Sequence, residues 1–256
     1  MRIRLAVLFL GVLCLAGRAN SQDSPENYNV ELGAMFWKPS PEIVISSGSL
    51  STPIDFVNVF PIEKKRFREL SLVLKAGRKN KIRYSSVSFE YSGTTPLTQQ
   101  IRFQGQTFDV GVPTTAELKW KLMRVGYEWD PIATDMGFAG LFVDVKFNKV
   151  NTHLSAPSPA PTESFERNVA VPTIGGIGRG YLSRYISVTG EFTALKLNNS
   201  SFNAKFYDFD VYGTTNFGRN AGAQFGYRSI TVDYVVDDDT GNLKMKGPYF
   251  GGVVRF

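Results

Sequence analysis

The only histidine of this 256-residue chain belongs to a His-x-Ser pair, His153 and Ser155. A histidine that activates serine for attack on a lipid ester needs a third, acidic group, and Glu163 or Glu166 follows in the same stretch. Such chemistry needs a rigid surface, whereas residues 156–162 are rich in proline and predict a loop. We therefore expect His153 to be a solvated loop residue and the chain to be no enzyme.

The cysteine, histidine and glycine content argues against other kinds of catalytic site. Cys14 is the only cysteine, and it lies in an N-terminal segment that we expect to be removed. One histidine without cysteine excludes multi-histidine metal sites and thiol chemistry, so we predict no metal and no cofactor. The glycine-rich stretch 171–181 lacks the strand-turn-helix context of a nucleotide loop. Glycine there makes room for bulky neighbours or bends a strand.

Acidic and basic residues interrupt apolar alternation at several places. In a water-filled or ion-paired lumen such charges are stable, whereas on a lipid face they are not. The predicted lumen charges are Glu90, Asp144, Lys146, Arg179, Glu191, Asp208 and Asp210. We expect them to pair and plug the interior, and the alternative is a narrow polar pore whose charges select ions.

A basic run forms the second candidate site. Its residues are Lys64, Lys65, Arg66 and Arg68. They are candidate contacts for the phosphates of lipopolysaccharide, and the alternative is a solvated charge run. The net charge falls from +6 to 6 − 3 = +3 once the first 21 residues, with three arginines and no acid, are removed. A net charge of +3 is too small to indicate binding of nucleic acid.

The elements that position these residues begin after a secretory signal. Arg2 and Arg4 precede the apolar stretch 5–16, and small residues follow up to Ser21. We predict a signal peptide over 1–21, cleaved near residues 19–21, and a single domain over 22–256. Leu13 before Cys14 excludes a lipoprotein signal. No apolar 20-residue run follows, so the mature exported chain is either soluble or a β-barrel.

Alternation with period two covers most of the mature chain. In 137–150, Leu141 and Val143 fall on one face, while Asp144 and Lys146 fall on the other. A β-sandwich would show the same period with the faces reversed. Short and long connections alternate, however, and aromatic residues lie near the strand ends, which favours a transmembrane antiparallel up-and-down β-barrel.

About ten strands are predicted, although the pattern also permits eight or twelve. Residues 122–124 and 227–230 break phase, and we interpret both as bulges. Long outer connections are expected over 38–67, 93–115 and 151–168, with a hairpin inside the second. The predicted strands are 28–37, 68–76, 81–92, 116–129, 137–150, 169–181, 185–197, 204–217, 221–236 and 242–256.

Within the first long connection, Thr52 is predicted to cap a short helix. Pro53 would take its first position and Asp55 its first turn. Such a segment would fold over or into the barrel mouth. The alternative is an irregular surface loop.

The final strand carries a third signal. Phe250, Val254 and Phe256 repeat at period two up to the last residue. Together with GRKNKIRYSSVSFEYSG, LMRVGYEWD, VPTIGGIGRGY, GAQFGYRSITVDY and KGPYFGGVVRF, this end resembles a broad set of uncharacterised outer-membrane β-barrel proteins, over about seven tenths of the chain. The resemblance implies a Gram-negative outer-membrane location and a terminal strand that the barrel assembly machinery recognises. It implies no particular activity.

Three hypotheses of function follow. The first is a non-catalytic surface barrel that binds through its extracellular loops, with outer-membrane lipid and lipopolysaccharide as partners. The second is a porin-like narrow channel for ions or small polar solutes. The third is a lipid A-modifying esterase. The secretion translocon is an expected partner during biogenesis, nucleic acid is not, and the sequence leaves the oligomeric state open.

Overall fold

The computed structural model describes residues 26–46, 52–63, 65–157, 162–198, 202–236 and 239–256. The predicted signal sequence lies outside these ranges and stays a prediction. Long antiparallel strands dominate the described chain. The wall strands are β1 (Val30–Trp37), β2 (Ser40–Ser46), β4 (Phe67–Lys75), β5 (Asn80–Pro96), β8 (Pro113–Thr134), β9 (Gly137–Ser155), β10 (Thr162–Ser183), β11 (Ile186–Asn198), β12 (Phe202–Phe217), β13 (Ala221–Val236) and β14 (Asp239–Arg255).

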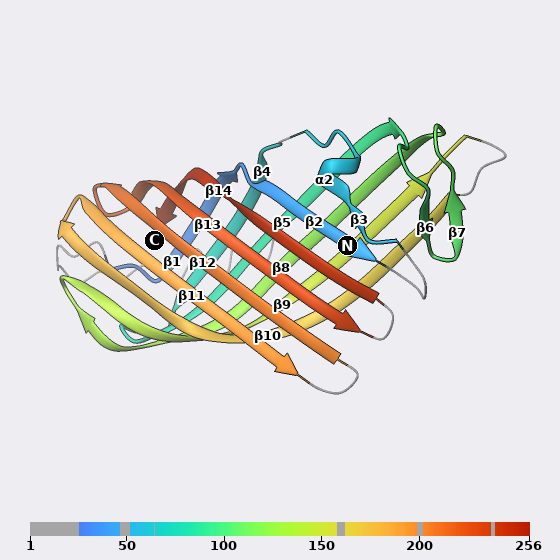
Figure 1. Cartoon of the computed structure of the whole chain (residues 1–256). Coiled ribbons are helices and arrows are strands. Elements are labelled where there is room, and N and C mark those ends of the chain that lie inside the picture. Colours follow the sequence, from blue (N-terminus) through green and yellow to red (C-terminus); the bar gives the residue numbers. More distant parts are fainter. Residues whose placement is uncertain (1–25, 47–51, 64, 158–161, 199–201, 237–238) are drawn as a thin grey trace, which may run out of the picture.

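The sheet closes on itself. β1 pairs with β4 on one edge and with β14 on the other (Figure 1). β2 follows β1 after Lys38 and Pro39 and pairs with the outer half of β14, so the two strands share one position in the wall. Of the twelve strands in the sheet, β3 (Ile54–Asp55) lies outside the wall, which leaves ten positions. The predicted ten-stranded antiparallel barrel is confirmed.

The two ends of the barrel differ in their connections. Short turns join β4 to β5, β8 to β9, β10 to β11 and β12 to β13, and the C-terminus lies at the same end (Figure 1). At the other end, β6 (Ile101–Phe103) and β7 (Gln106–Phe108) form the predicted hairpin. The predicted long connection 151–168 is wrong, because β9 and β10 stay paired as far as Ser155 and Thr162.

The long wall strands change the chemistry of their faces partway along their length. In β5 near the short turn, Lys81 is buried inside and Ile82 is exposed outside; further along, Phe89 is buried inside and Glu90 is exposed outside. Lipid surrounds the first part, so apolar side chains must face outward there. The second part projects into water and encloses an ordinary apolar core. The predicted lumen position of Glu90 is therefore wrong.

The same change explains the two predicted bulges, which are also wrong. Pairing is continuous through 122–124 and 227–230 on both edges of each strand. The inward face simply passes from apolar Leu122 to charged Arg124, and from Ile230 to Arg228. The register shifts lie instead beside the short turns after β8 and β10.

An outward apolar belt surrounds the half of the barrel nearest the short turns. Its members include Leu141, Val143, Phe192, Phe209 and Phe250, which are between 45% and 55% exposed. Apolar exposure on this scale around a closed sheet is the surface that a bilayer covers. Among the described residues, no helix has the length and apolar character needed to cross a membrane.

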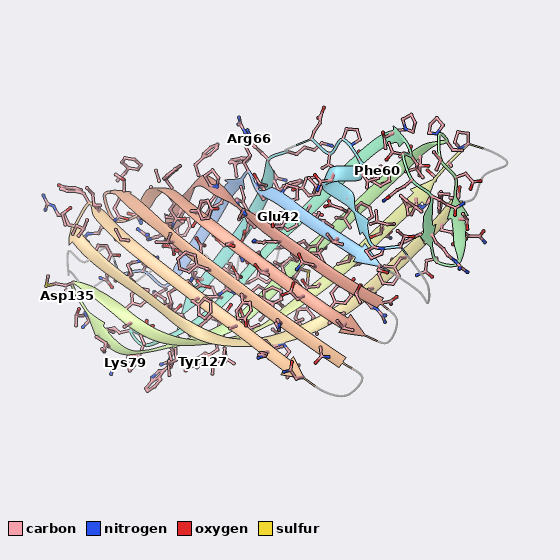
Figure 2. The ribbon with its side chains drawn as sticks, in the orientation of Figure 1. Glu42, Phe60, Arg66, Lys79, Tyr127 and Asp135 are labelled. Atoms are coloured by element: carbon pink, nitrogen blue, oxygen red, sulfur yellow. The ribbon has the colours of Figure 1, made fainter. Side chains whose placement is uncertain are left out.

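A short helix folds into the outer mouth of the barrel. Helix α2 (Phe56–Val59) begins after Asp55, whose carboxylate accepts hydrogen bonds from the amides of Val57 (3.1 Å) and Asn58 (3.0 Å). The helix was predicted at this place, but the predicted cap at Thr52 is wrong, because the Asp55 carboxylate satisfies the free amides. Phe60, labelled in Figure 2, lies buried against β5.

Candidate ligand site in the barrel wall

A lattice of ion pairs fills the membrane half of the lumen. Lys146 is fully buried and donates to Asp144 (2.7 Å), Thr173 (2.8 Å) and Thr193 (2.7 Å). Asp144 also accepts from Arg124 at 2.6 Å. These groups come from β8, β9, β10 and β11, so the lattice ties four strands of the wall together.

The lattice continues to both sides of the lumen. Arg228 on β13 donates to Asp208 at 2.9 Å and 2.8 Å and to Glu69 on β4 at 2.6 Å. On the other side, Lys81 on β5 pairs with Glu128 on β8 at 2.6 Å. Buried charges are stable only when they are paired in this way.

The predicted lumen charges meet in this lattice, with the exception of Glu90. Asp144, Lys146, Arg179, Glu191 and Asp208 are buried inside it, and Asp210 accepts a hydrogen bond from the Tyr249 hydroxyl at 2.8 Å. Several of their partners were not predicted from the sequence. The missed members are Glu69, Lys81, Arg124, Glu128 and Arg228. In the sequence these charged residues alternate with apolar residues such as Ile82, Val125 and Tyr127, which face outward. That alternation is the signal that could have located them.

The lattice ends near the short turns at Glu26, just before β1. The Glu26 carboxylate lies 2.8 Å from Arg179 and 3.0 Å from Lys75. Burial alone would raise the pKa of Glu26, but these cations hold it well below its ordinary range. Glu26 is therefore ionised and links the chain before β1 to β10 and β4.

An aromatic layer closes the lumen above the ion pairs. Phe89 on β5 contacts Trp37, Phe67 and Trp120, with ring centroids 5.4 Å, 5.1 Å and 5.1 Å apart. Arg228 lies 5.6 Å from the Trp37 ring, so the charged lattice and the aromatic layer touch. The interior is thus filled at two successive levels.

The wall separates between β10 and β11. These strands pair from their turn only as far as Ile174 and Ala194. Beyond that point β10 runs on to Thr162 paired with β9, and β11 runs on to Asn198 paired with β12. Pro172 lies in the separated part of β10, where a residue without an N–H group is tolerated at a strand edge.

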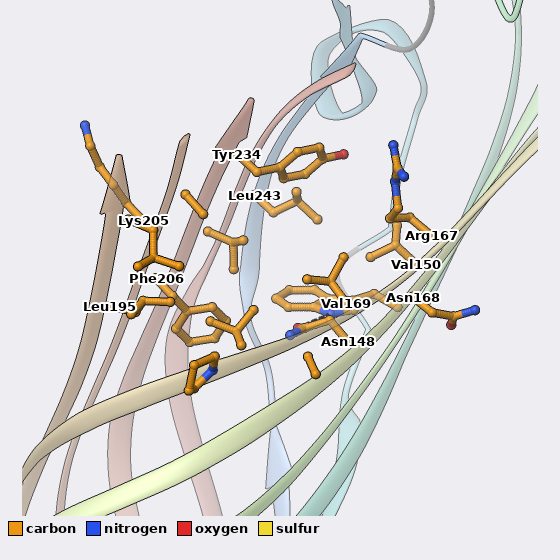
Figure 3. A pocket seen from close by; sticks show the side chains of 17 residues that line it. Asn148, Val150, Arg167, Asn168, Val169, Leu195, Lys205, Phe206, Tyr234 and Leu243 are labelled. Carbon is orange, nitrogen blue, oxygen red and sulfur yellow. Dashed lines mark hydrogen bonds between the residues drawn. The ribbon is translucent and has the colours of Figure 1, made fainter. Parts of the chain in front are cut away.

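An apolar cavity of about 210 Å³ lies at this separation. Figure 3 shows Val150, Val169 and Leu243 converging on it. Phe206 also lines it, and the Lys146 amine of the ion-pair lattice lies 5.2 Å from the Phe206 ring. Trp120 also lines it and donates to Asn148 at 3.1 Å. The lining thus reaches from the aromatic interior to the gap in the wall.

Two lysines stand on the outward face beside this cavity. Lys196 on β11 and Lys205 on β12 are directly opposite in the register, and Lys205 borders the cavity (Figure 3). Like charges directly opposite on neighbouring strands destabilise a sheet. Among the described residues neither lysine has an ion-pair partner, whereas Lys149 on the same outer rim pairs with Glu166 at 2.8 Å.

The predicted basic run lies on the same rim, further around the barrel. Lys65, Arg66 and Arg68 are exposed, and Figure 2 shows Arg66 at the upper margin of the wall. Lys64 lies outside the described residues. Their contact with lipopolysaccharide stays a prediction.

The predicted His-x-Ser pair lies on a strand. His153 and Ser155 belong to β9, and His153 is opposite Glu117 and Ser164. The expectation of a loop histidine is wrong, because the β9–β10 ladder extends beyond the membrane belt.

No family model and no curated protein matches the chain. Among solved structures, the outer membrane protease OmpT of Escherichia coli is similar with a TM-score of 0.59 and 10% identity, over 89% of this chain and 97% of that one. Ail of Yersinia pestis (TM-score 0.38, 9% identity, 89% and 99% covered) and the NalP translocator domain of Neisseria meningitidis (0.44, 8%, 89% and 89%) are more distant.

At this level of identity the OmpT similarity concerns the fold alone. A closed ten-stranded barrel, an outward apolar belt and a charged interior define a bacterial outer-membrane β-barrel protein, and the chain is one. Phe250, Val254 and Phe256 are exposed on its lipid side at the end with the short turns.

Proposed function

We propose that the protein is a non-conducting, non-catalytic outer-membrane barrel that binds ligands at the outer part of its wall. The observation that carries this proposal is the double closure of the lumen by the ion-pair lattice and the aromatic layer around Phe89. A conducting pore needs a continuous water path, and buried side chains at both levels occupy the lumen where such a path would run.

The channel hypothesis would need space that the lattice occupies. The cavity inside the lattice, beside Arg228 and Asp210, has a volume of about 60 Å³. That volume holds only a few water molecules, since one water needs roughly 10–15 Å³ on this measure. Water in a cavity of this size can solvate the charges.

The direct test is single-channel recording from the purified, refolded protein in a planar bilayer. We expect insertion, verified by flotation with lipid vesicles, without conductance steps. Discrete and reproducible steps, with an ion selectivity that changes in Asp210→Asn, would overturn the proposal and support the channel.

The non-catalytic part has a separate test. His153→Ala and Ser155→Ala should leave the acylation of lipid A unchanged in cells that produce each variant. If production of the wild-type protein changes the acylation of lipid A and each substitution abolishes that change, the protein is the esterase.

A further inference from the structure

We propose that the gap between β10 and β11 binds one acyl chain of a phosphorylated outer-leaflet lipid, lipid A, with Lys196 and Lys205 on its phosphate. The inference deepens the proposed function and rests on it. Three independent observations support it: the position of the gap, the apolar cavity behind it, and the two lysines beside it.

The position of the gap gives access from the lipid at its inner end. Ile174, the last paired residue of β10, is 64% exposed on the outward face, and Phe192 on β11 is 47% exposed. Both belong to the apolar belt, so the gap opens where the belt ends and lipid headgroups begin. An acyl chain from the outer leaflet reaches this point without leaving the membrane.

The cavity fits a hydrocarbon chain in chemistry and size. Val150, Val169 and Leu243 line it, and Phe206 and Trp120 add aromatic surface. Its volume of about 210 Å³ exceeds the roughly 150 Å³ of an engineered apolar cavity that binds benzene. It is large enough for a segment of an acyl chain.

The depth of the cavity is limited from below. Lys146 with Thr173 and Thr193 forms a polar layer on the inner side of Phe206, and Lys146 lies 5.2 Å from the Phe206 ring. These polar groups are already hydrogen-bonded to one another. A chain that enters the gap therefore stops at this layer and does not pass into the lower lumen.

The paired lysines supply the recognition of an anion. Lys196 and Lys205 face each other across β11 and β12, and an anion between them removes their repulsion. The lysines of β14 show the contrast, because Lys244 and Lys246 already share Glu42 at 3.2 Å and 2.5 Å. Of these two lysine pairs, the one at the cavity has no acidic partner among the described residues and needs an external counter-charge.

Arg167 at the cavity margin is not part of this anion site. Its guanidinium pairs with Asp239 at 2.5 Å and is directed away from Val169 (Figure 3). This pair joins β10 to β14 across the mouth, so the Arg167 guanidinium already has its counter-charge.

Binding of purified lipid A to the refolded barrel in detergent micelles tests the inference. Val169→Trp fills the cavity, and Val188→Trp, which adds the same ring on the lipid face near the short turn and away from the gap, is the matched control. We expect Val169→Trp to weaken binding at least about tenfold, the loss that about two unburied methylene groups produce. Val188→Trp should bind as the wild type does.

The anion site has its own matched pair of variants. Lys196→Gln with Lys205→Gln should weaken binding of lipid A but not of dephosphorylated lipid A. Lys244→Gln with Lys246→Gln should change neither. Equal binding by Val169→Trp and wild type, binding of lauric acid in preference to lipid A, or no effect of the Lys196 and Lys205 changes would each overturn the inference. A barrel without conductance that binds no lipid A overturns this inference alone and leaves the closed lumen intact.

Discussion

Replacing Arg228 with methionine tests whether paired charges hold the membrane half of the barrel together. Arg228 binds Asp208 through two hydrogen bonds and is the partner of Glu69 at 2.6 Å. Without it, Glu69 has no other partner among the described residues, and Asp208 retains only Lys146 at 3.8 Å. Two buried carboxylates would thus lose their counter-charge in a single substitution.

The expected loss of unfolding free energy is large. Removing one member of a buried ion pair costs about 3–5 kcal/mol, because the remaining charge stays buried. Since Arg228 serves two carboxylates, we expect the upper end of that range. Equilibrium unfolding in urea, followed by tryptophan fluorescence of the barrel in detergent micelles, measures it.

Two further variants make the result decisive. Arg78 pairs with Asp135 at 2.7 Å, but both side chains are more than 60% exposed, so Arg78→Met should cost about 0–1 kcal/mol. Combining Arg228→Met with Asp208→Asn and Glu69→Gln should recover most of the loss, because no unpaired charge remains. Equal costs for the two arginine variants, or a triple variant no more stable than Arg228→Met, would refute the reasoning.

Two more predictions follow from single positions. Gly175→Ala should prevent correct assembly, because a Cβ there would lie 1.8 Å from the Phe192 carbonyl oxygen. The loss would be seen in electrophoresis as the absence of the heat-modifiable folded band. Gly180→Ala is the control and should fold, because a Cβ there would meet no atom within 4 Å. The Glu26 carboxylate has a lowered pKa in the folded state, so its contribution to stability is full above the unfolded value and is lost as pH falls. The stability difference between wild type and Glu26→Gln should therefore be largest at neutral pH and shrink below about pH 4.5; a difference that grows in acid would contradict the assignment.

The sequence by itself determined the architecture. Alternation is a local property, because neighbouring residues of a strand point to opposite faces, so residues 137–150 already show where β9 runs and which residues face together. The order of short and long connections then predicts up-and-down pairing and closure. Within the membrane half, Asp144 and Lys146, which were predicted for the lumen, are buried there and paired with each other.

The tertiary structure decided which solvent each strand segment meets. Glu90 on β5 and Asp144 on β9 have the same local pattern of alternation. Glu90 lies in the outer part of the barrel and faces water, whereas Asp144 lies in the membrane half and faces the lumen. Period two is identical on both sides of the membrane boundary, so a sequence cannot locate it. The pairing of Arg228 with Glu69, 159 positions away, and the gap between β10 and β11 likewise arise only when distant strands come together.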